Sequence, residues 1–161
     1  MKSCGTCGMC CKLVAIPALE KPAASWCPKY VMKTGCGDYE GRPDACHAFE
    51  CLYLTAEGLG DEWRPDKAKF MIWTGRESRR LIIDVDPAAP MAWRQQPYYA
   101  QIKAWSDRRH PEPFEVAVRV NGRLTIVFPE ADIELGVEQA LPIESGYDGA
   151  NRPFARYVAT R

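Results

Sequence analysis

Histidine is scarce in this sequence, and cysteine is absent from most of it. The 161 residues include only His47 and His110, and all eight cysteines lie between Cys4 and Cys51, so the last 110 residues contain none. No hydrophobic run approaches the roughly 18 residues of a membrane span. The 21 basic and 21 acidic side chains leave no formal net charge, so bulk electrostatics attract neither nucleic acid nor an anionic membrane. We therefore expect no nucleic-acid partner and no membrane partner.

The N-terminal residues lack the apolar stretch of a secretion signal. Met1-Lys2-Ser3-Cys4-Gly5 is short and polar. We therefore expect a cytoplasmic location, where reducing conditions make metal binding commoner than disulfides in cysteine-rich segments. A disulfide framework is the minor alternative, since the number of cysteines is even.

The cysteine-free part of the sequence lacks the motifs of the common enzyme classes. It has no phosphate-binding glycine loop and no nucleotide fingerprint. Asp84 and Asp86 alternate with apolar residues, which is typical of the polar side of a strand. His110 is followed by proline and is expected in a loop. We predict no catalytic residue here, and whether the chain is an enzyme stays open.

The cysteine-rich segment begins with Cys4-Gly5-Thr6-Cys7-Gly8-Met9-Cys10-Cys11. Two residues between cysteines let both sulfurs reach one ion, which is typical of zinc and iron–sulfur sites. Gly5 and Gly8 fit such a site, because glycine tolerates positive φ angles and leaves N–H groups free to point at sulfur. Adjacent cysteines diverge in extended backbone. Cys10 and Cys11 therefore favour two metal positions, or one polynuclear cluster with ligands on both sides.

The predicted metal ligands are all eight cysteines, namely Cys4, Cys7, Cys10, Cys11, Cys27, Cys36, Cys46 and Cys51. Eight thiolates suit two four-ligand sites, and two divalent ions would leave a net charge of −4. Residues 1–55 hold six basic and five acidic side chains, so they offset only one of these charges. Arg42, in an Arg-Pro turn, is the cation expected beside the metal. His47 is expected to be a partly exposed residue outside the ligand set.

Three stretches together carry a resemblance to a known family. They are Cys-x2-Cys-x2-Cys-Cys followed by Cys27, then Gly35-Cys36-Gly37-Asp38-Tyr39-Glu40-Gly41-Arg42-Pro43, and Cys46-His47-Ala48-Phe49-Glu50-Cys51. This order resembles the YkgJ-like cysteine-cluster family, over about the first third of the chain. His47 stands where that family usually has arginine. The resemblance implies a zinc- or iron-chelating domain with eight cysteines.

The metal is either zinc, with two ions expected, or an iron–sulfur cluster, since all-thiolate ligation suits both. An iron–sulfur centre favours electron transfer with a redox partner. Zinc favours a stabilised protein-interaction module without catalysis, and metal sequestration or transfer is a third hypothesis. Zinc catalysis has the least support, because a full thiolate shell leaves no open position for substrate.

The pattern of the whole chain predicts an α+β fold. We expect an irregular cysteine-rich segment over residues 1–55, packed as one compact unit on a scaffold over residues 56–161. The segment contains a helical turn over 28–34 and a short helix over 44–54 that begins at Asp44.

The scaffold is expected to be a small antiparallel sheet with one main helix. Strands are predicted over 69–74, 81–86, 115–120 and 123–128, with a further one near Ile133 and Leu135 and a helix over 95–108. Asn121-Gly122 predicts a hairpin. If only one sheet face is buried, the apolar pattern favours a three-residue loop over a two-residue one. From Ser145 onward we expect a surface tail.

Overall fold

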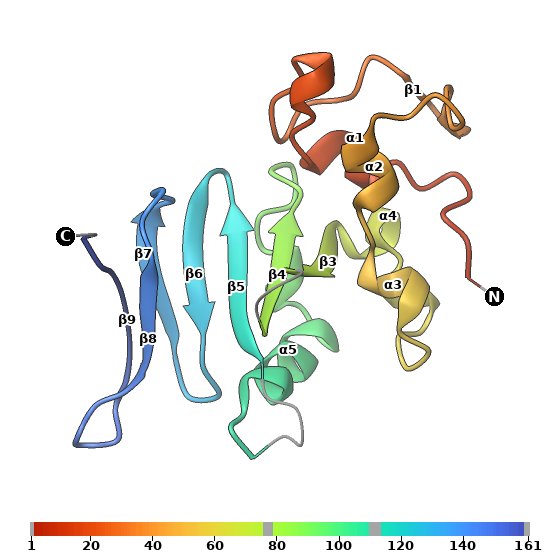
Figure 1. The fold of residues 1–161 in the computed structure, drawn as a ribbon. Coiled ribbons are helices and arrows are strands. Elements are labelled where there is room, and N and C mark those ends of the chain that lie inside the picture. The colour runs from red at the N-terminus through yellow and green to blue at the C-terminus, as the bar shows by residue number, and fades with distance from the viewer. Residues whose placement is uncertain (1, 76–78, 110–113, 160–161) are drawn as a thin grey trace. The chain divides into compact units, whose positions relative to one another are not determined.

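A computed structural model describes residues 2–75, 79–109 and 114–159, and its mixed helix and strand content confirms the α+β class (Figure 1). His110 and part of the loop after Gly75 lie outside the described residues. By its contacts the chain divides into two compact units, residues 1–73 with 84–93, and residues 74–83 with 94–161. Each unit is described by itself. The boundary expected after residue 55 falls inside the first unit.

Short helices form most of the regular structure in the first 70 residues. They are α1 (Met9–Leu13), η1 (Pro17–Leu19), α2 (Asp44–Ala48), α3 (Leu52–Thr55), η2 (Asp61–Trp63) and α4 (Pro65–Ala68). The helix predicted to begin at Asp44 does so, but Phe49 is extended, with φ −79° and ψ 124°, and separates α2 from α3. The side chain of Phe49 packs edge-on against Trp73, with ring centroids 6.1 Å apart.

The helical turn predicted over residues 28–34 is wrong. This stretch begins a small hairpin in which β1 (Tyr30–Val31) pairs antiparallel with β2 (Gly35–Cys36). The turn between the strands is closed by the N–H of Thr34, which donates to the carbonyl of Val31 at 3.0 Å. Lys33 adopts a positive φ of 62° in that turn, which ends any helical path.

The first unit is held together by a small apolar cluster and one buried ion pair. Met9, Leu13 and Met71 are buried together, and Cys7, Cys10 and other partly buried side chains pack against them. Asp86 was expected on the polar side of a strand, but it is only 6% exposed. Its carboxylate accepts from Lys12 Nζ at 2.6 Å and from the Ala88 N–H at 2.9 Å.

The largest sheet has the strand order β3-β4-β5-β6-β7. Its strands are β3 (Phe70–Thr74), β4 (Arg80–Val85), β5 (Glu115–Val120), β6 (Arg123–Val127) and β7 (Asp132–Val137), close to the predicted ranges. The other elements are η3 (Ala92–Arg94) and α5 (Tyr98–Ser106), which is the main helix and lies against β5 and β6 (Figure 1). None of the described helices has the length and apolar character needed to cross a bilayer.

The hairpin at Asn121-Gly122 has a two-residue loop, so the favoured three-residue register is wrong. Val120 pairs with Arg123 and Val118 with Thr125. Both loop residues have positive φ, 51° and 70°, as a tight turn of this type needs. The prediction assumed one buried face, but Val118 on one face of β5 and Ala117 on the other are both almost fully buried. Burial of both faces removes the reason for the longer loop.

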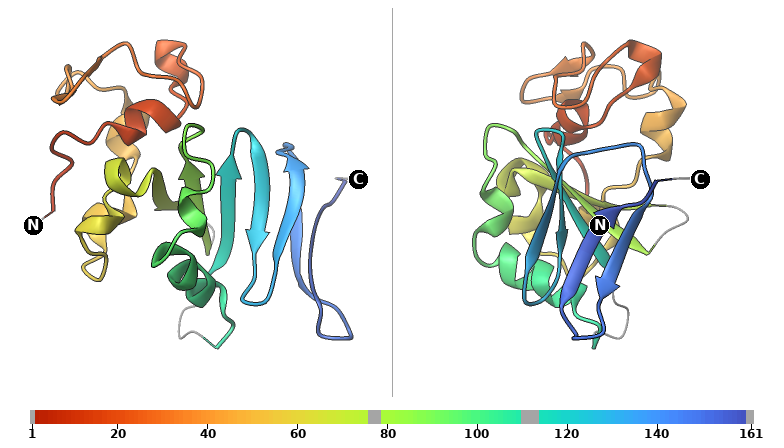
Figure 2. Two further views of the ribbon diagram at one scale, coloured as in Figure 1. Left: turned by 180° about the vertical axis from the view of Figure 1, so that it is seen from behind. Right: turned by 90° about the vertical axis from the view of Figure 1, so that its left-hand side faces the viewer.

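The stretch from Ser145 was predicted to be a surface tail that needs docking to be ordered; it is docked, but as regular strands and not as a tail. The C-terminal residues form a second hairpin, β8 (Ile143–Tyr147) with β9 (Pro153–Tyr157) (Figure 2). Its apolar side chains pack on the buried cluster formed by Ala117, Leu124, Ile126 and Phe128. Phe128 and Tyr147 meet edge to face with centroids 5.4 Å apart. This contact holds the β8–β9 hairpin against the sheet.

Candidate metal centre

The first four cysteines lie on a turn followed by α1. The N–H of Cys7 donates to the carbonyl of Cys4 at 2.9 Å, and Gly5 has a positive φ, 50°. Cys10 and Cys11 are in helical rather than extended backbone. Successive side chains of a helix are about 100° apart, so these two thiols point in different directions.

Glycine is required at position 8 because another side chain lies very close to its Cα, and not because of a positive φ. The φ of Gly8 is −119°, so the tolerance of glycine for positive φ is not used here. A Cβ atom at this position would lie 2.0 Å from the ring of Tyr30. Tyr30 in turn stacks on Trp26, with ring centroids 4.2 Å apart. The glycine therefore lets the β1 side of the small hairpin lie against the cysteine turn.

Backbone hydrogen bonds bring the later cysteines back to α1. The N–H of Cys27 donates to the carbonyl of Cys11 at 2.8 Å, and the N–H of Tyr30 donates to the carbonyl of Cys27 at 3.0 Å. Tyr30 is the strand partner of Cys36. Cys46 lies on α2, and Cys51 is the residue at which α3 begins.

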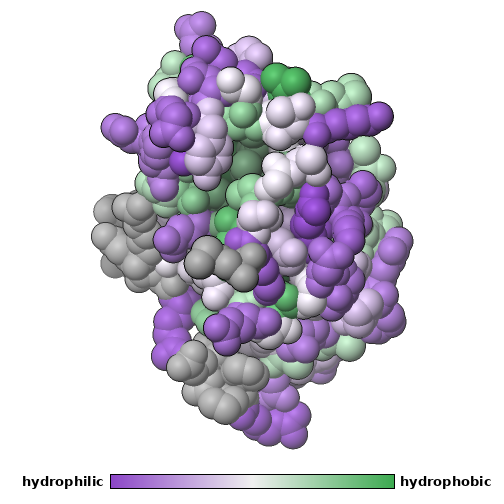
Figure 3. All heavy atoms as spheres, turned by 90° about the vertical axis from the view of Figure 1, so that its right-hand side faces the viewer, coloured by the Kyte–Doolittle hydropathy of each residue, from purple (hydrophilic) through white to green (hydrophobic). Residues whose placement is uncertain are grey.

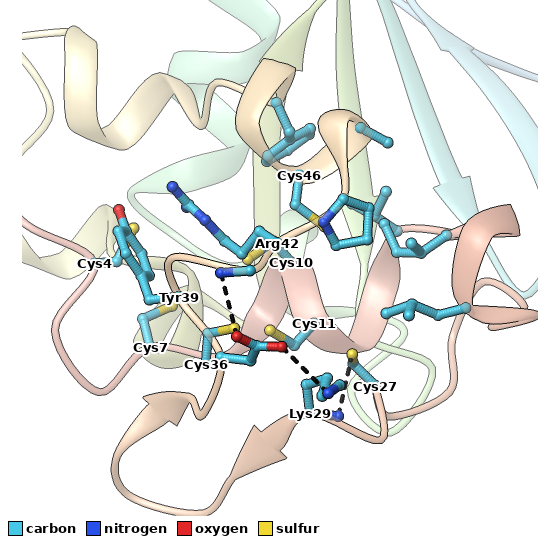
Figure 4. A pocket seen from close by; sticks show the side chains of 18 of the residues that line it. Cys4, Cys7, Cys10, Cys11, Cys27, Lys29, Cys36, Tyr39, Arg42 and Cys46 are labelled. Atoms are coloured by element: carbon cyan, nitrogen blue, oxygen red, sulfur yellow. Dashed lines mark hydrogen bonds and ion pairs between the residues drawn. The ribbon is translucent and has the colours of Figure 1, made fainter.

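Seven of the eight predicted cysteines line one cavity of about 160 Å³, and the eighth, Cys51, lines a smaller neighbouring cavity of about 30 Å³. Figure 4 shows the larger cavity, and Figure 3 shows a recess with hydrophobic walls bordered by hydrophilic side chains. All eight cysteines are free thiols. Within residues 2–75, 79–109 and 114–159, no group of three or more His, Cys, Asp or Glu side chains is arranged to hold an ion.

A buried lysine that the sequence analysis missed lies beside the thiols. Lys21 is 4% exposed, and its ammonium donates to the carbonyls of Lys12, Val14 and Pro22. Burial lowers its pKa, whereas the cysteines nearby, Cys27 foremost, act to raise it. Nothing in the local sequence marks Lys21, because it follows an alanine- and proline-containing stretch and is placed by its bridge to Ile16.

Arg42 lines the larger cavity and is not an ordinary solvated turn residue. Its guanidinium carbon is 3.6 Å from the centroid of the Tyr39 ring. Its Nη2 lies 3.3 Å from Nδ1 of His47, which is exposed and does not line the cavity. Its Nε is buried without a hydrogen-bond partner among the described residues. A buried, unpaired donor favours a negatively charged neighbour.

The thiols differ in acidity. The thiol of Cys10 donates a hydrogen bond to the sulfur of Cys11, which raises the pKa of Cys10 and lowers the pKa of Cys11. Burial raises the pKa of Cys4, Cys7 and Cys46, and raises the pKa of Cys51 to about 11. Without metal, most of these thiols are therefore protonated at neutral pH.

The donor types suit a thiolate-bound metal, although the described side chains would have to move closer together to hold one. A cation would replace the thiol protons, and the resulting negative centre would offset the buried charge of Lys21 and give the Arg42 Nε a negative neighbour. The eight cysteines would hold the metal. Comparison with protein-family models, curated proteins and solved structures finds no match for this chain.

Proposed function

We propose that this chain is a cytoplasmic metal-binding protein that holds zinc ions or an iron–sulfur centre through its eight cysteines. The buried ammonium of Lys21 is the observation that supports this most directly. A lysine that is 4% exposed is stabilised by nearby negative charge, and the cysteines whose charges raise its pKa are Cys27, Cys11, Cys10 and Cys46. Thiolates supply that charge once a metal has displaced their protons.

The resemblance of residues 4–51 to the YkgJ-like cysteine-cluster family supports the same proposal. It rests on the spacing of the cysteines and on the Arg42-Pro43 turn. The position of Arg42 at the larger cavity is compatible with a role beside the metal.

The metal decides between the activities proposed. An iron–sulfur centre would transfer electrons to and from a redox partner, whereas zinc would stabilise the first unit for protein contacts or be held for transfer. Elemental analysis and an anaerobic absorption spectrum separate these cases. Iron with sulfide gives brown protein and broad visible absorbance, whereas zinc gives colourless protein.

The proposal is tested with the full chain purified without oxygen. We expect bound metal, and we expect a chelator to increase amide hydrogen exchange in residues 2–73 and 84–93 more than in residues 114–159. Cys7→Ser should lose metal and increase disorder within the first third of the chain. A chain that holds no metal when expressed with iron and zinc, or a Cys7→Ser variant with unchanged metal content and circular dichroism, would contradict the proposal.

A further inference from the structure

The cysteines fall into two sets when their place in the fold is followed. The smaller cavity is lined by Cys4, Cys7, Cys10 and Cys51, and by no other cysteine. The remaining four thiols, of Cys11, Cys27, Cys36 and Cys46, line only the larger cavity. We propose that these two sets are two separate four-thiolate metal sites, an inference that rests on the metal-binding function proposed above.

The first set is brought together by the start of the chain and the start of α3. The turn that joins Cys4 to Cys7 leads directly into α1, which carries Cys10. Cys7 and Cys10 pack against the apolar cluster that contains Met71, and Met71 also lines the smaller cavity. Cys51 completes this set. The charges of Cys7, Cys4 and Cys10 raise the pKa of Cys51, and no cysteine of the second set is among the main causes of that shift.

The second set is brought together by backbone pairing. Cys11 accepts from the N–H of Cys27, and Tyr30 links Cys27 to Cys36 by a hydrogen bond and a strand pair. The sulfur of Cys11 lies between those of Cys27 and Cys36 in the view of Figure 4. The charges of Cys36, Cys27 and Cys46 act to raise the pKa of Cys11. Lys21 belongs to this side, since Cys27 and Cys11 lead the charges that raise its pKa. Arg42 serves both sets, since its charge lowers the pKa of Cys4 as well as that of Cys46.

Cys10 and Cys11 form the junction of the two sets. They are neighbours on α1, joined by a hydrogen bond between their side chains, but their Cα–Cβ directions differ by about 100°. The charge of Cys10 also raises the pKa of Cys46, ahead of those of Cys27 and Cys36, so the two sets adjoin at Cys10. In chain order, the first three cysteines and the last make one site, and the middle four make the other.

A direct test uses the unmodified full chain, reduced, stripped of metal and loaded with cadmium-113. Two resonances are expected, one correlated with the β protons of Cys4, Cys7, Cys10 and Cys51, and the other with those of the second set. A resonance whose ligands mix the two sets would overturn the grouping. A chain that binds no cadmium, and that carries no metal when purified, would overturn the metal-binding function as well.

Matched variants provide a second measurement. Cys51→Ser and Cys27→Ser are each expected to halve the metal content, whether it is zinc, or iron with sulfide. In Cys51→Ser the second set should resist alkylation while Cys4, Cys7 and Cys10 are labelled, and Cys27→Ser should show the reverse. A second serine within one set, as in Cys4→Ser/Cys51→Ser, should remove no further metal, whereas Cys27→Ser/Cys51→Ser should remove all of it. Loss of all metal from either single variant, with circular dichroism unchanged, would indicate one shared cluster instead.

Discussion

The ammonium of Lys12, the residue after Cys11, lies 2.6 Å from a carboxylate oxygen of Asp86, and both side chains are largely buried, with 16% and 9% exposed. The same ammonium is 5.5 Å from the ring centroid of Trp26. This ion pair ties α1, which carries two predicted ligands, to the residues that follow β4. It gives the cysteine segment an anchor that is independent of metal.

Asp86→Asn is expected to lower the free energy of unfolding by about 2 kcal/mol, because it leaves Lys12 as a buried charge without its anionic partner. The amide oxygen can still accept from the Ala88 N–H, so the loop itself is retained. Chemical denaturation of the metal-loaded chain measures the change. Asp38→Asn is the control, since the Lys29–Asp38 pair is about half exposed, and it should change stability by less than about 1 kcal/mol. Equal effects of the two variants would show that burial of the first pair contributes nothing.

Lys21→Met should destabilise the metal-loaded chain by about 3 kcal/mol and speed metal loss to a chelator. The change removes a buried positive charge beside the thiolates and leaves three carbonyls without their donor. Denaturation midpoints and the rate of metal transfer to a coloured chelator report the two effects. Lys33→Met changes an exposed position of the β1–β2 turn. It should change the free energy of unfolding by no more than about 0.5 kcal/mol and leave the rate of metal transfer unchanged. An unchanged rate of metal release from the Lys21 variant would show that the Lys21 charge does not stabilise the thiolates.

Thiol alkylation should follow the pKa directions in the reduced, metal-free chain. Cys11 has a lowered pKa because the Cys10 thiol donates to its sulfur, whereas burial raises the pKa of Cys51 to about 11. The thiolate is the reactive form. Cys11 is therefore expected to react with iodoacetamide at a lower pH than Cys51 does.

Mass spectrometry of peptides labelled between pH 6 and pH 10 measures this order. Cys10→Ala removes the donor, so the labelling of Cys11 should move to higher pH while that of Cys51 stays where it is. The hydrogen-bond explanation is wrong if Cys10→Ala leaves the pH profile of Cys11 unchanged.

Gly122→Ala should cost about 1 kcal/mol or more for purely conformational reasons. Gly122 has φ +70°, and a Cβ atom there would meet nothing within 4 Å, so strain and not a clash sets the penalty. Gly149→Ala is the matched control, because its added Cβ is equally free and its φ is not in the left-handed region. Thermal unfolding should show a lower Tm for the first variant and an unchanged or slightly higher one for the second. Similar shifts for both would argue against the two-residue turn.

Sequence reasoning placed the eight cysteines in one region, whereas the metal site itself stays a prediction, and it missed a buried cation nearby. The spacing of the cysteines identified the region, and the structure places all eight along two neighbouring cavities. Arg42 lines the larger cavity, while its predicted place beside a metal stays a prediction. Lys21 could not be predicted, because its burial depends on a fold-back of the chain at Ile16 and not on any local pattern.

The strands predicted from the sequence were those with a local apolar pattern, and the features missed depend on contacts between residues distant in sequence. Strands with a clear apolar run were found, such as Glu115–Val120. The β8–β9 hairpin was missed because Ser145 and Gly146 break its alternation, although Gly146 faces the ring of Phe154 across the pair. The loop length at Asn121 was missed because burial of both sheet faces is decided by elements distant in sequence.

The chain crosses between its two units at residues 73/74, 83/84 and 93/94. Truncating the chain at any one position therefore cannot give the complete first unit without part of the second. A transplanted stretch of the first 73 codons would leave Lys12 without Asp86 and Trp73 without the carboxylate of Asp84 that accepts from its indole. The cysteine segment therefore depends on residues 84–93 for its support, and it would not transfer to another protein as a separate module.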